Sequence, residues 1–347
     1  MKNKNITKIG FIYFVCIILI AVIFVLGSFG LIKNDYLSSF LIQCVVLFAV
    51  PLLLYTLMVS KSTKQTFSDA GFKKINGKMI AISILLGVIL YIINTFVAST
   101  FSSIIHMLGY ESISLGSSVE SISYLTLLKE LFLSCFLPAV CEEFLHRGIL
   151  MHANKKYSNP RYALFISSLL FGLLHLNINQ FFYAAILGAF IGYVGLFSDS
   201  IFPCMIIHFM NNALSTYFYY GSFFNWPLAN FINEFEAMLA SNLLTFIVFV
   251  SLSIMLLIVC YRLLVKQMMK ERAKMDIANI IKYLKANNLT IEQAQEKINQ
   301  INVVMQQSLH LNKTQTEKRT MKSHVFYICS IVLGSLITIA SFIWGLI

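Results

Sequence analysis

Long apolar segments constrain this chain more than any other feature of its sequence. Runs of about twenty apolar residues recur along its whole length, and about twenty residues are what an α-helix needs to cross a hydrocarbon core. Hydrophobic residues make up 58% of the 347 residues and charged residues only 12%, which is not the composition of a soluble globular domain of this size. The sequence therefore predicts an all-α fold, a polytopic membrane helical bundle of about nine transmembrane helices.

The distribution of charge predicts how these helices cross the membrane. A net charge of +11 would fit nucleic-acid binding in a soluble protein, but here Lys and Arg gather in a few short loops, and none occurs between Tyr162 and Tyr261. This is the positive-inside pattern of a multispan protein. We therefore expect an integral membrane protein with a cytoplasmic N-terminus, whose surroundings are the lipid bilayer and which binds no nucleic acid. The large excess of Lys over Arg is typical of an AT-rich bacterial genome, so we expect the membrane to be a bacterial cell membrane.

Composition shifts divide the chain into parts. The predicted parts are N-terminal transmembrane helices (1–121), a core that carries the polar motifs (122–221), a further transmembrane helix (222–265), a basic cytoplasmic segment (266–324) and a C-terminal transmembrane helix (325–347). The basic segment has two apolar stripes at helical spacing, which begin at Ile277 and Ala294. It is either a helical hairpin on the anionic inner leaflet or a docking module for a substrate or partner.

The stretch CEEFLHRG at 141–148 places ionisable residues in the middle of an apolar run. Such residues cost several kcal/mol at bilayer depth, so their default interpretation is functional. A spacing of four puts Glu143 and Arg147 on one helix face, most simply as a structural ion pair. Glu142 points about 100° away and has no cation of its own. We assign His146 and His152, nearer the cytoplasmic end of the same helix, to structural roles.

Three more polar residues are predicted to lie below the membrane surface on neighbouring helices. Counted from the cytoplasmic turn near 156–160, Glu142 and His175 both lie about 21–23 Å deep at ~1.5 Å per residue. Counted from Ser200 at the same rise, His208 and Asn212, on one face of a later helix, lie about 12 and 18 Å deep. A lone histidine in a membrane is more often an interhelical hydrogen-bonder than a catalyst. The convergence of an unpaired Glu, two His and an Asn on three helices indicates a site.

These residues form three short motifs in a fixed order. They are EExxxR in EEFLHR (Glu142, Glu143, Arg147), FxxxH in FGLLH (Phe171, His175) and HxxxN in HFMNN (His208, Asn212). In this order they resemble the CPBP family of CAAX-prenyl-protease-2-like and bacteriocin-processing intramembrane proteases, also called the Abi family. The resemblance covers about 122–221. It implies an all-helical bundle around a polar cavity, and hydrolysis of a peptide bond in a membrane-associated peptide or protein.

The resemblance also implies roles for the motif residues. Glu142, in a low-dielectric site, suits a general base and acid, and His175 would orient the attacking water. His208 and Asn212 would offer N–H donors to the oxyanion. The supporting residues would be Glu143, Arg147 and Phe171.

The sequence leaves the cofactor and two other functions open. Glu142, His175 and His208 match the ligand set of a catalytic zinc site with water in the fourth position. A metal-free mechanism uses the same residues, and no HExxH helix is present, so zinc or another divalent metal and no metal both remain open. A non-enzymatic membrane immunity or scaffold protein would use the polar cluster to join helices. A transporter should show repeated halves, and we find no repeat.

Overall fold

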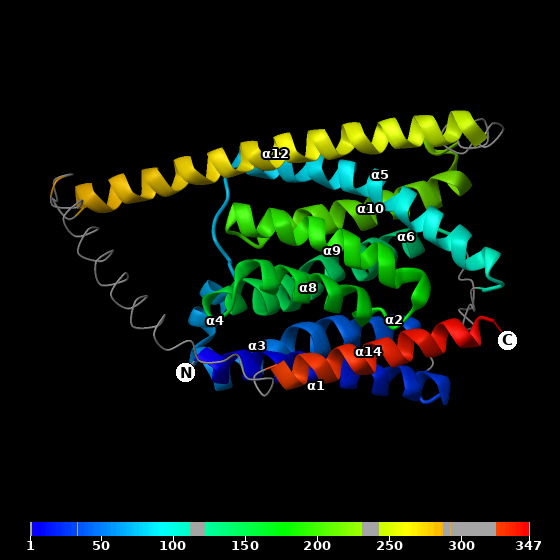
Figure 1. The fold of residues 1–347 in the computed structure, drawn as a ribbon, viewed down its shortest axis with the longest axis horizontal. Coiled ribbons are helices and arrows are strands. Elements are labelled where there is room, and N and C mark those ends of the chain that lie inside the picture. The colour runs from blue at the N-terminus through cyan, green and yellow to red at the C-terminus, as the bar shows by residue number, and fades with distance from the viewer. Residues whose placement is uncertain are drawn as a thin grey trace.

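The computed structural model describes residues 2–32, 34–111, 122–230, 243–286, 292 and 324–346. Within these ranges the chain forms helices and no β-strand, and the long helices lie side by side with their axes running in one general direction (Figure 1). Apolar residues cover most of their surfaces, as expected for helices whose solvent is lipid. The predicted all-α polytopic bundle is therefore confirmed.

Seven spans in the described part are long and apolar enough to cross a membrane. They are Lys4–Ser28, Asp35–Ser60, Gly77–Met107, Tyr124–Lys156, Ile178–Ser198, Ser251–Leu284 and Val325–Trp344. Our expected count of about nine also includes two helices that are not among these seven spans. Helix α8 (Pro160–Leu174) is apolar but has only 15 residues, and α10 (Phe202–Phe224) is long enough but carries polar residues, including His208.

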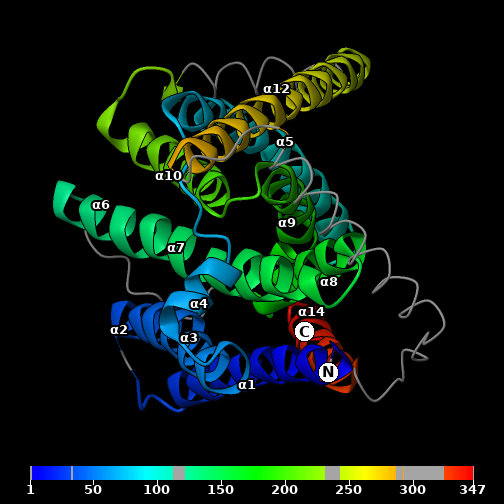
Figure 2. The same cartoon turned by 90° about the vertical axis from the view of Figure 1, so that its left-hand side faces the viewer.

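The span that carries the two glutamates runs through the middle of the molecule. It consists of α6 (Tyr124–Glu130), η3 (Leu131–Phe136), α7 (Leu137–Glu143), η4 (Phe144–Ala153) and η5 (Asn154–Lys156). Segments η3 and η4 have the wider turns of a π-helix, a geometry that is often found at functional sites. In Figure 2 this span lies between α1 to α4 on one side and α5, α10 and α12 on the other. Every residue of η4 is buried.

Two apolar clusters hold these layers together. One joins α1 (Lys2–Ser28), η1 (Leu41–Ala49), η4 and α8, and the other joins α5 (Gly77–Met107), α9 (Ile178–Ser198), α10 and α12 (Leu243–Ala286). The remaining short helices are α2 (Asp35–Phe40), α3 (Val50–Tyr55), η2 (Thr56–Ser60) and α4 (Thr63–Asp69). The polar motif residues lie where the two clusters meet.

A tight hairpin of α8 and α9 positions one side of the site. Pro160 opens α8, where its fixed φ suits a first helical residue, and His175 is the C-cap residue that follows Leu174. Leu176 follows with a φ of 50°, and the side chain of Asn177 then caps the start of α9. The chain therefore reverses directly after His175, so this side chain sits at the end of α8, beside the beginning of α9.

The C-terminal part differs in detail from our expectation. Helix α12 is continuous over 44 residues and passes through our boundary at 265–266. The first apolar stripe of the basic segment, including Ile277, is an exposed part of this helix, and the second stripe lies outside the described residues. Helix α14 (Val325–Trp344) lies beside α1 (Figure 1). Its buried Tyr327 accepts a hydrogen bond at 3.1 Å from Asn154.

Candidate active site

The ion pair expected from the four-residue spacing forms at the centre of the bundle. Arg147 Nη1 donates to Glu143 Oε1 at 2.8 Å, and both side chains are completely buried. The second guanidinium nitrogen of Arg147 donates to the Gly188 carbonyl at 2.9 Å, and the guanidinium carbon lies 4.4 Å from the centre of the Phe171 ring. Arg147 is therefore neutralised, hydrogen-bonded and stacked on an aromatic face, as a buried cation needs to be.

Gly188 explains how α9 comes so close to this pair. A Cβ at this position would lie 3.2 Å from Arg147 Nη2 and 3.2 Å from Phe171 Cδ1. One helical turn later, a Cβ at Gly192 would lie 2.5 Å from Leu164. Small residues at such spacing let membrane helices approach backbone to backbone. The glycines of α9 thus bring a backbone carbonyl within reach of Arg147.

His208 lies between the two carboxylates. Its Nδ1 is 2.9 Å from Glu143 Oε1, and its Nε2 is 4.0 Å from Glu142 Oε2. Because an ionised carboxylate only accepts hydrogen bonds, Nδ1 carries the hydrogen. The sequence had paired Glu143 with Arg147 alone, so this second partner is a finding of the structure. Glu143 therefore orients His208 as well as Arg147.

Glu142 has a neutral partner that the sequence analysis missed. Gln43 of η1 donates from Nε2 to Glu142 Oε1 at 2.8 Å, and both residues are buried. Gln43 is the only amide in the apolar run LIQCVVLFAV. A lone amide at bilayer depth needs a partner, and this signal could have marked the position. Its partner, 99 residues later, could not have been named from spacing.

Phe171 is the aromatic centre of the site. Its ring centroid lies 5.0 Å from that of His146, 5.5 Å from that of His175 and 5.7 Å from that of His208. His175 Nδ1 is 3.0 Å from the Phe171 carbonyl oxygen, so Nδ1 carries a hydrogen and Nε2 of the neutral ring carries the lone pair. Phe171 thus sets the positions of three imidazoles around one edge of the site.

Asn212 lies one turn along α10 from His208, but its contacts are with η3. Its amide nitrogen donates to the Ser134 carbonyl at 3.0 Å. Pro138, four residues after Ser134, has no N–H to donate to that carbonyl, so the Asn212 amide supplies the donor. The amide oxygen accepts from Asn211 at 3.1 Å. One hydrogen on the Asn212 amide nitrogen is left for another acceptor.

Several buried polar atoms around Glu142 have no hydrogen-bond partner among the described residues. They are Gln43 Oε1, Glu143 Oε2, His146 Nε2 and Arg147 Nε. Ordered water commonly satisfies such atoms in a protein interior. His146, which we assigned to a structural role, contacts the Glu142 carbonyl of its own helix through Nδ1 at 2.8 Å. The site is thus a small polar region enclosed by apolar side chains.

The donor set does not fit a three-ligand metal site. In the described part of the chain, no three His, Cys, Asp or Glu residues lie close enough together to hold a metal ion. This includes the ligands considered from the sequence, Glu142, His175 and His208. We therefore derive no chemical step through a metal.

Comparison with known protein families finds a similarity over the same region. Residues 124–214 match the family model described as type II CAAX prenyl endopeptidase Rce1-like. Searches of curated proteins and of solved structures gave no match. The matched segment begins at α6, ends within α10 and contains all the motif residues.

Proposed function

We propose that the chain is an intramembrane endopeptidase, because residues 124–214 match the family model described as type II CAAX prenyl endopeptidase Rce1-like. The family implies hydrolysis of a peptide bond within the membrane, here in a membrane-associated peptide or protein. One observation supports this proposal above all. Glu142 is a buried carboxylate held by a neutral amide, with a histidine nitrogen 4.0 Å from its other oxygen.

The first step of the proposed mechanism is activation of water by Glu142. Gln43 occupies Oε1, so Oε2 is the oxygen that faces the site. A water bound there would give a proton to Glu142 as its oxygen forms a bond to the substrate carbonyl carbon. The lone pair on His175 Nε2 would accept the second hydrogen of this water and align it for attack. Glu142 then passes its proton to the leaving nitrogen as the C–N bond breaks.

His208 is the proposed donor to the oxyanion. With a hydrogen on each ring nitrogen, His208 would donate from Nε2 to the oxyanion while Nδ1 remains bonded to Glu143. His208 Nε2 lies 4.0 Å from Glu142 Oε2, a distance that supports a donor beside the proposed base. This distance is too long for a direct hydrogen bond, so Nε2 can donate to the substrate oxyanion instead. The second hydrogen on the Asn212 amide nitrogen would be an additional donor.

A comparison of membrane peptides tests the proposal. We would compare strains that produce wild type, Glu142→Gln or no protein, with Glu130→Gln of α6 as a control on the same span. Uncleaved precursors should accumulate equally in the Glu142→Gln strain and the deletion strain, and Glu130→Gln should match wild type. If the peptides of Glu142→Gln match those of wild type, the enzyme proposal fails and the scaffold alternative, in which the cluster only joins helices, is favoured.

A further inference from the structure

Helix α5 has a polar face at its far end that the mechanism does not use. Its residues are exposed and follow the spacing i, i+3, i+4, i+7 of one helix face: Ser99, Ser102, Ser103 and His106. The rest of α5 is strongly apolar. Polar groups directed at lipid cost free energy, so this face must meet water or a polar ligand.

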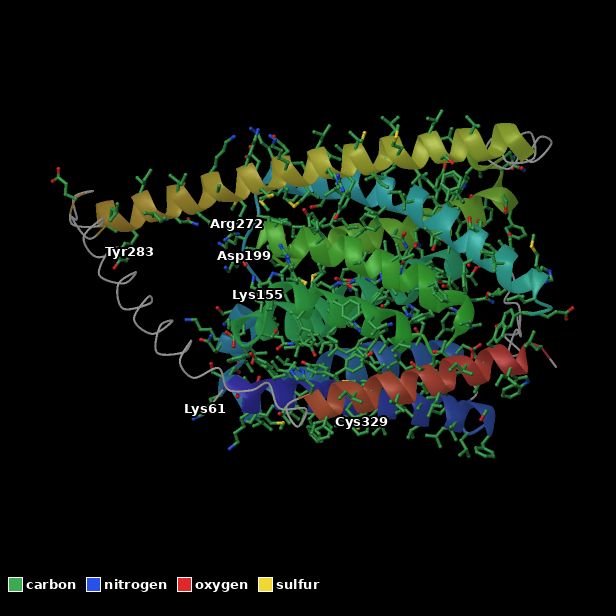
Figure 3. All side chains as sticks on the ribbon, viewed as in Figure 1. Lys61, Lys155, Asp199, Arg272, Tyr283 and Cys329 are labelled. Carbon is green, nitrogen blue, oxygen red and sulfur yellow. The ribbon has the colours of Figure 1, made fainter. Side chains whose placement is uncertain are left out.

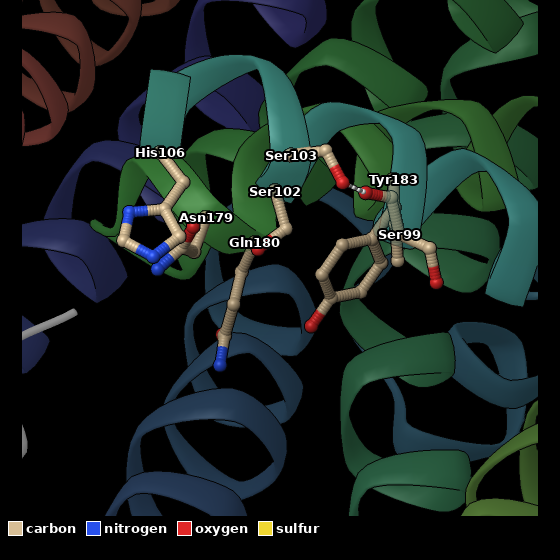
Figure 4. Close-up of a pocket in the computed structure, with 8 residues that line it drawn as sticks. Ser99, Ser102, Ser103, His106, Asn179, Gln180 and Tyr183 are labelled. Carbon is tan, nitrogen blue, oxygen red and sulfur yellow. Dashed lines mark hydrogen bonds between the residues drawn. The ribbon is translucent and has the colours of Figure 1, made fainter. Parts of the chain in front are cut away.

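The polar face of α5 forms one wall of a pocket. The pocket has a volume of about 580 Å³ and lies between α5 and the start of α9. Asn179, Gln180 and Tyr183 form its other wall, and Figure 4 shows side chains from both helices projecting toward the same space. This volume falls within the usual range for ligand pockets.

The pocket adjoins the proposed active site. Asn179 follows His175 by four residues, across the α8–α9 turn. Tyr183, in the same wall, lies five residues before Gly188 on α9, and the Gly188 carbonyl accepts a hydrogen bond from Arg147. The inner end of the pocket therefore lies beside the end of α8 that carries His175, and its wall there presents the amide side chains of Asn179 and Gln180.

The chemistry of the walls favours a peptide backbone over a charged ligand. Hydroxyl and amide groups donate and accept, and none of the described lining residues is Lys, Arg, Asp or Glu. A phosphate headgroup would find no cation there other than a protonated His106. An extended peptide in a membrane, by contrast, must have its N–H and C=O groups satisfied by protein or water. A substrate helix must unwind to expose its scissile carbonyl, so this requirement arises during cleavage.

We propose that this pocket binds the unwound, extended segment of the substrate next to the scissile bond. Since α5 ends here, the segment would come from the side of the membrane that the charge pattern predicts to be non-cytoplasmic. The inference rests on the proposed endopeptidase function and adds to it a substrate class, peptides whose cleavage site lies in the outer half of the bilayer.

Site-specific photo-cross-linking in native membranes tests the pocket. The full chain with Glu142→Gln would carry p-benzoylphenylalanine at Ala98, which lines the pocket. The matched control carries it at Ile104, an exposed α5 residue outside the lining. We expect cross-linked peptides at 98 and not at 104. These peptides should be the ones that accumulate uncleaved in Glu142→Gln membranes, and the cross-link should map within a few residues of the wild-type cleavage site.

Kinetics on a quenched decapeptide spanning that cleavage site give a second readout. Tyr183→Phe and Gln180→Leu should each raise KM about three- to tenfold, the effect of losing one hydrogen bond, with kcat little changed. Tyr193→Phe, on an exposed part of α9, should leave both constants as in wild type.

The outcomes separate the two proposals. If position 98 cross-links to phospholipid alone, or if KM is unchanged in both pocket variants, the proposal that the pocket binds substrate is overturned. The endopeptidase proposal is unaffected by either result. Peptides that cross-link at 98 but are equally abundant in wild-type and Glu142→Gln membranes would overturn the endopeptidase proposal, while the pocket would still bind peptide.

Discussion

Glu142 and Glu143 are neighbours in sequence, yet the structure surrounds them differently. Glu143 is completely buried, and its Oε1 contacts both Arg147 and His208. Glu142 contacts the neutral amide of Gln43, and its other oxygen lies at the edge of the polar region. Successive helical side chains point about 100° apart, so adjacent positions can meet opposite surroundings. One helix can therefore carry a carboxylate that holds the structure and a carboxylate that is left available for chemistry.

The largest expected effect comes from removing the available carboxylate. Glu142→Gln should lower cleavage about 10²–10⁴-fold, the range for loss of a general acid–base. The amide has nearly the same shape, so the melting temperature should stay within about 2 °C of wild type. Cleavage of an accumulated precursor and thermal unfolding, both on purified protein, would measure the two effects. Unfolding of Glu142→Gln at much lower temperature would mean that this carboxylate is structural too.

The complementary change removes the structural carboxylate. Glu143→Gln leaves Arg147 buried without a counter-charge, and breaking a buried pair in this way costs about 3–5 kcal/mol. We expect a strongly reduced yield of folded protein and a lower melting temperature, with Glu130→Gln as the control. If Glu143→Gln were as stable as wild type, the Gly188 carbonyl and the Phe171 ring would be sufficient to stabilise the buried charge of Arg147.

A third change tests whether Gln43 positions Glu142. Gln43→Leu leaves Oε1 of Glu142 without its donor. We expect kcat to fall about tenfold with KM unchanged, because the interaction orients the base and does not bind substrate. Cys44→Ala, the adjacent change on η1, is the control for packing. A rise in KM at constant kcat would instead assign Gln43 to substrate binding.

The contrast between the two glutamates was only partly predictable. The Glu143–Arg147 pair follows from spacing within one helix, and the all-helical fold follows from the apolar runs. The contact between His208 and Glu143 could not be predicted in this way, because our depth estimate assumed the rise per residue of an α-helix. The wider turns of η4 have a shorter rise per residue than an α-helix, which brings Glu142 and Glu143 nearer the turn at 156–160 and closer to the level of His208. The length of α12 was missed because Lys, Arg and Glu, which end a membrane span, are good helix formers.

The smallest expected effect comes from a carboxylate with two cationic partners outside the membrane spans. Asp199, in the turn between α9 and α10, accepts from Lys155 at 2.7 Å and also from Lys73, and Figure 3 shows Lys155 and Asp199 close together near one end of the bundle. Burial alone would raise the pKa of Asp199, but the hydrogen bonds and charges of Lys155 and Lys73 lower it to about 2. Unlike Glu143, its side chain is 33% exposed.

Asp199→Asn should therefore cost at most about 1 kcal/mol at pH 7, as for exposed ion pairs. Its φ of 49° is one that Asn tolerates, so the backbone should not add strain. Because the folded pKa lies below the unfolded value of about 3.9, the stabilisation is present above that value and is lost as the pH falls toward about 2. Melting temperatures of wild type and Asp199→Asn should thus differ slightly at pH 7 and converge near pH 2. A loss at pH 7 as large as that of Glu143→Gln would show that burial is not what separates the two carboxylates.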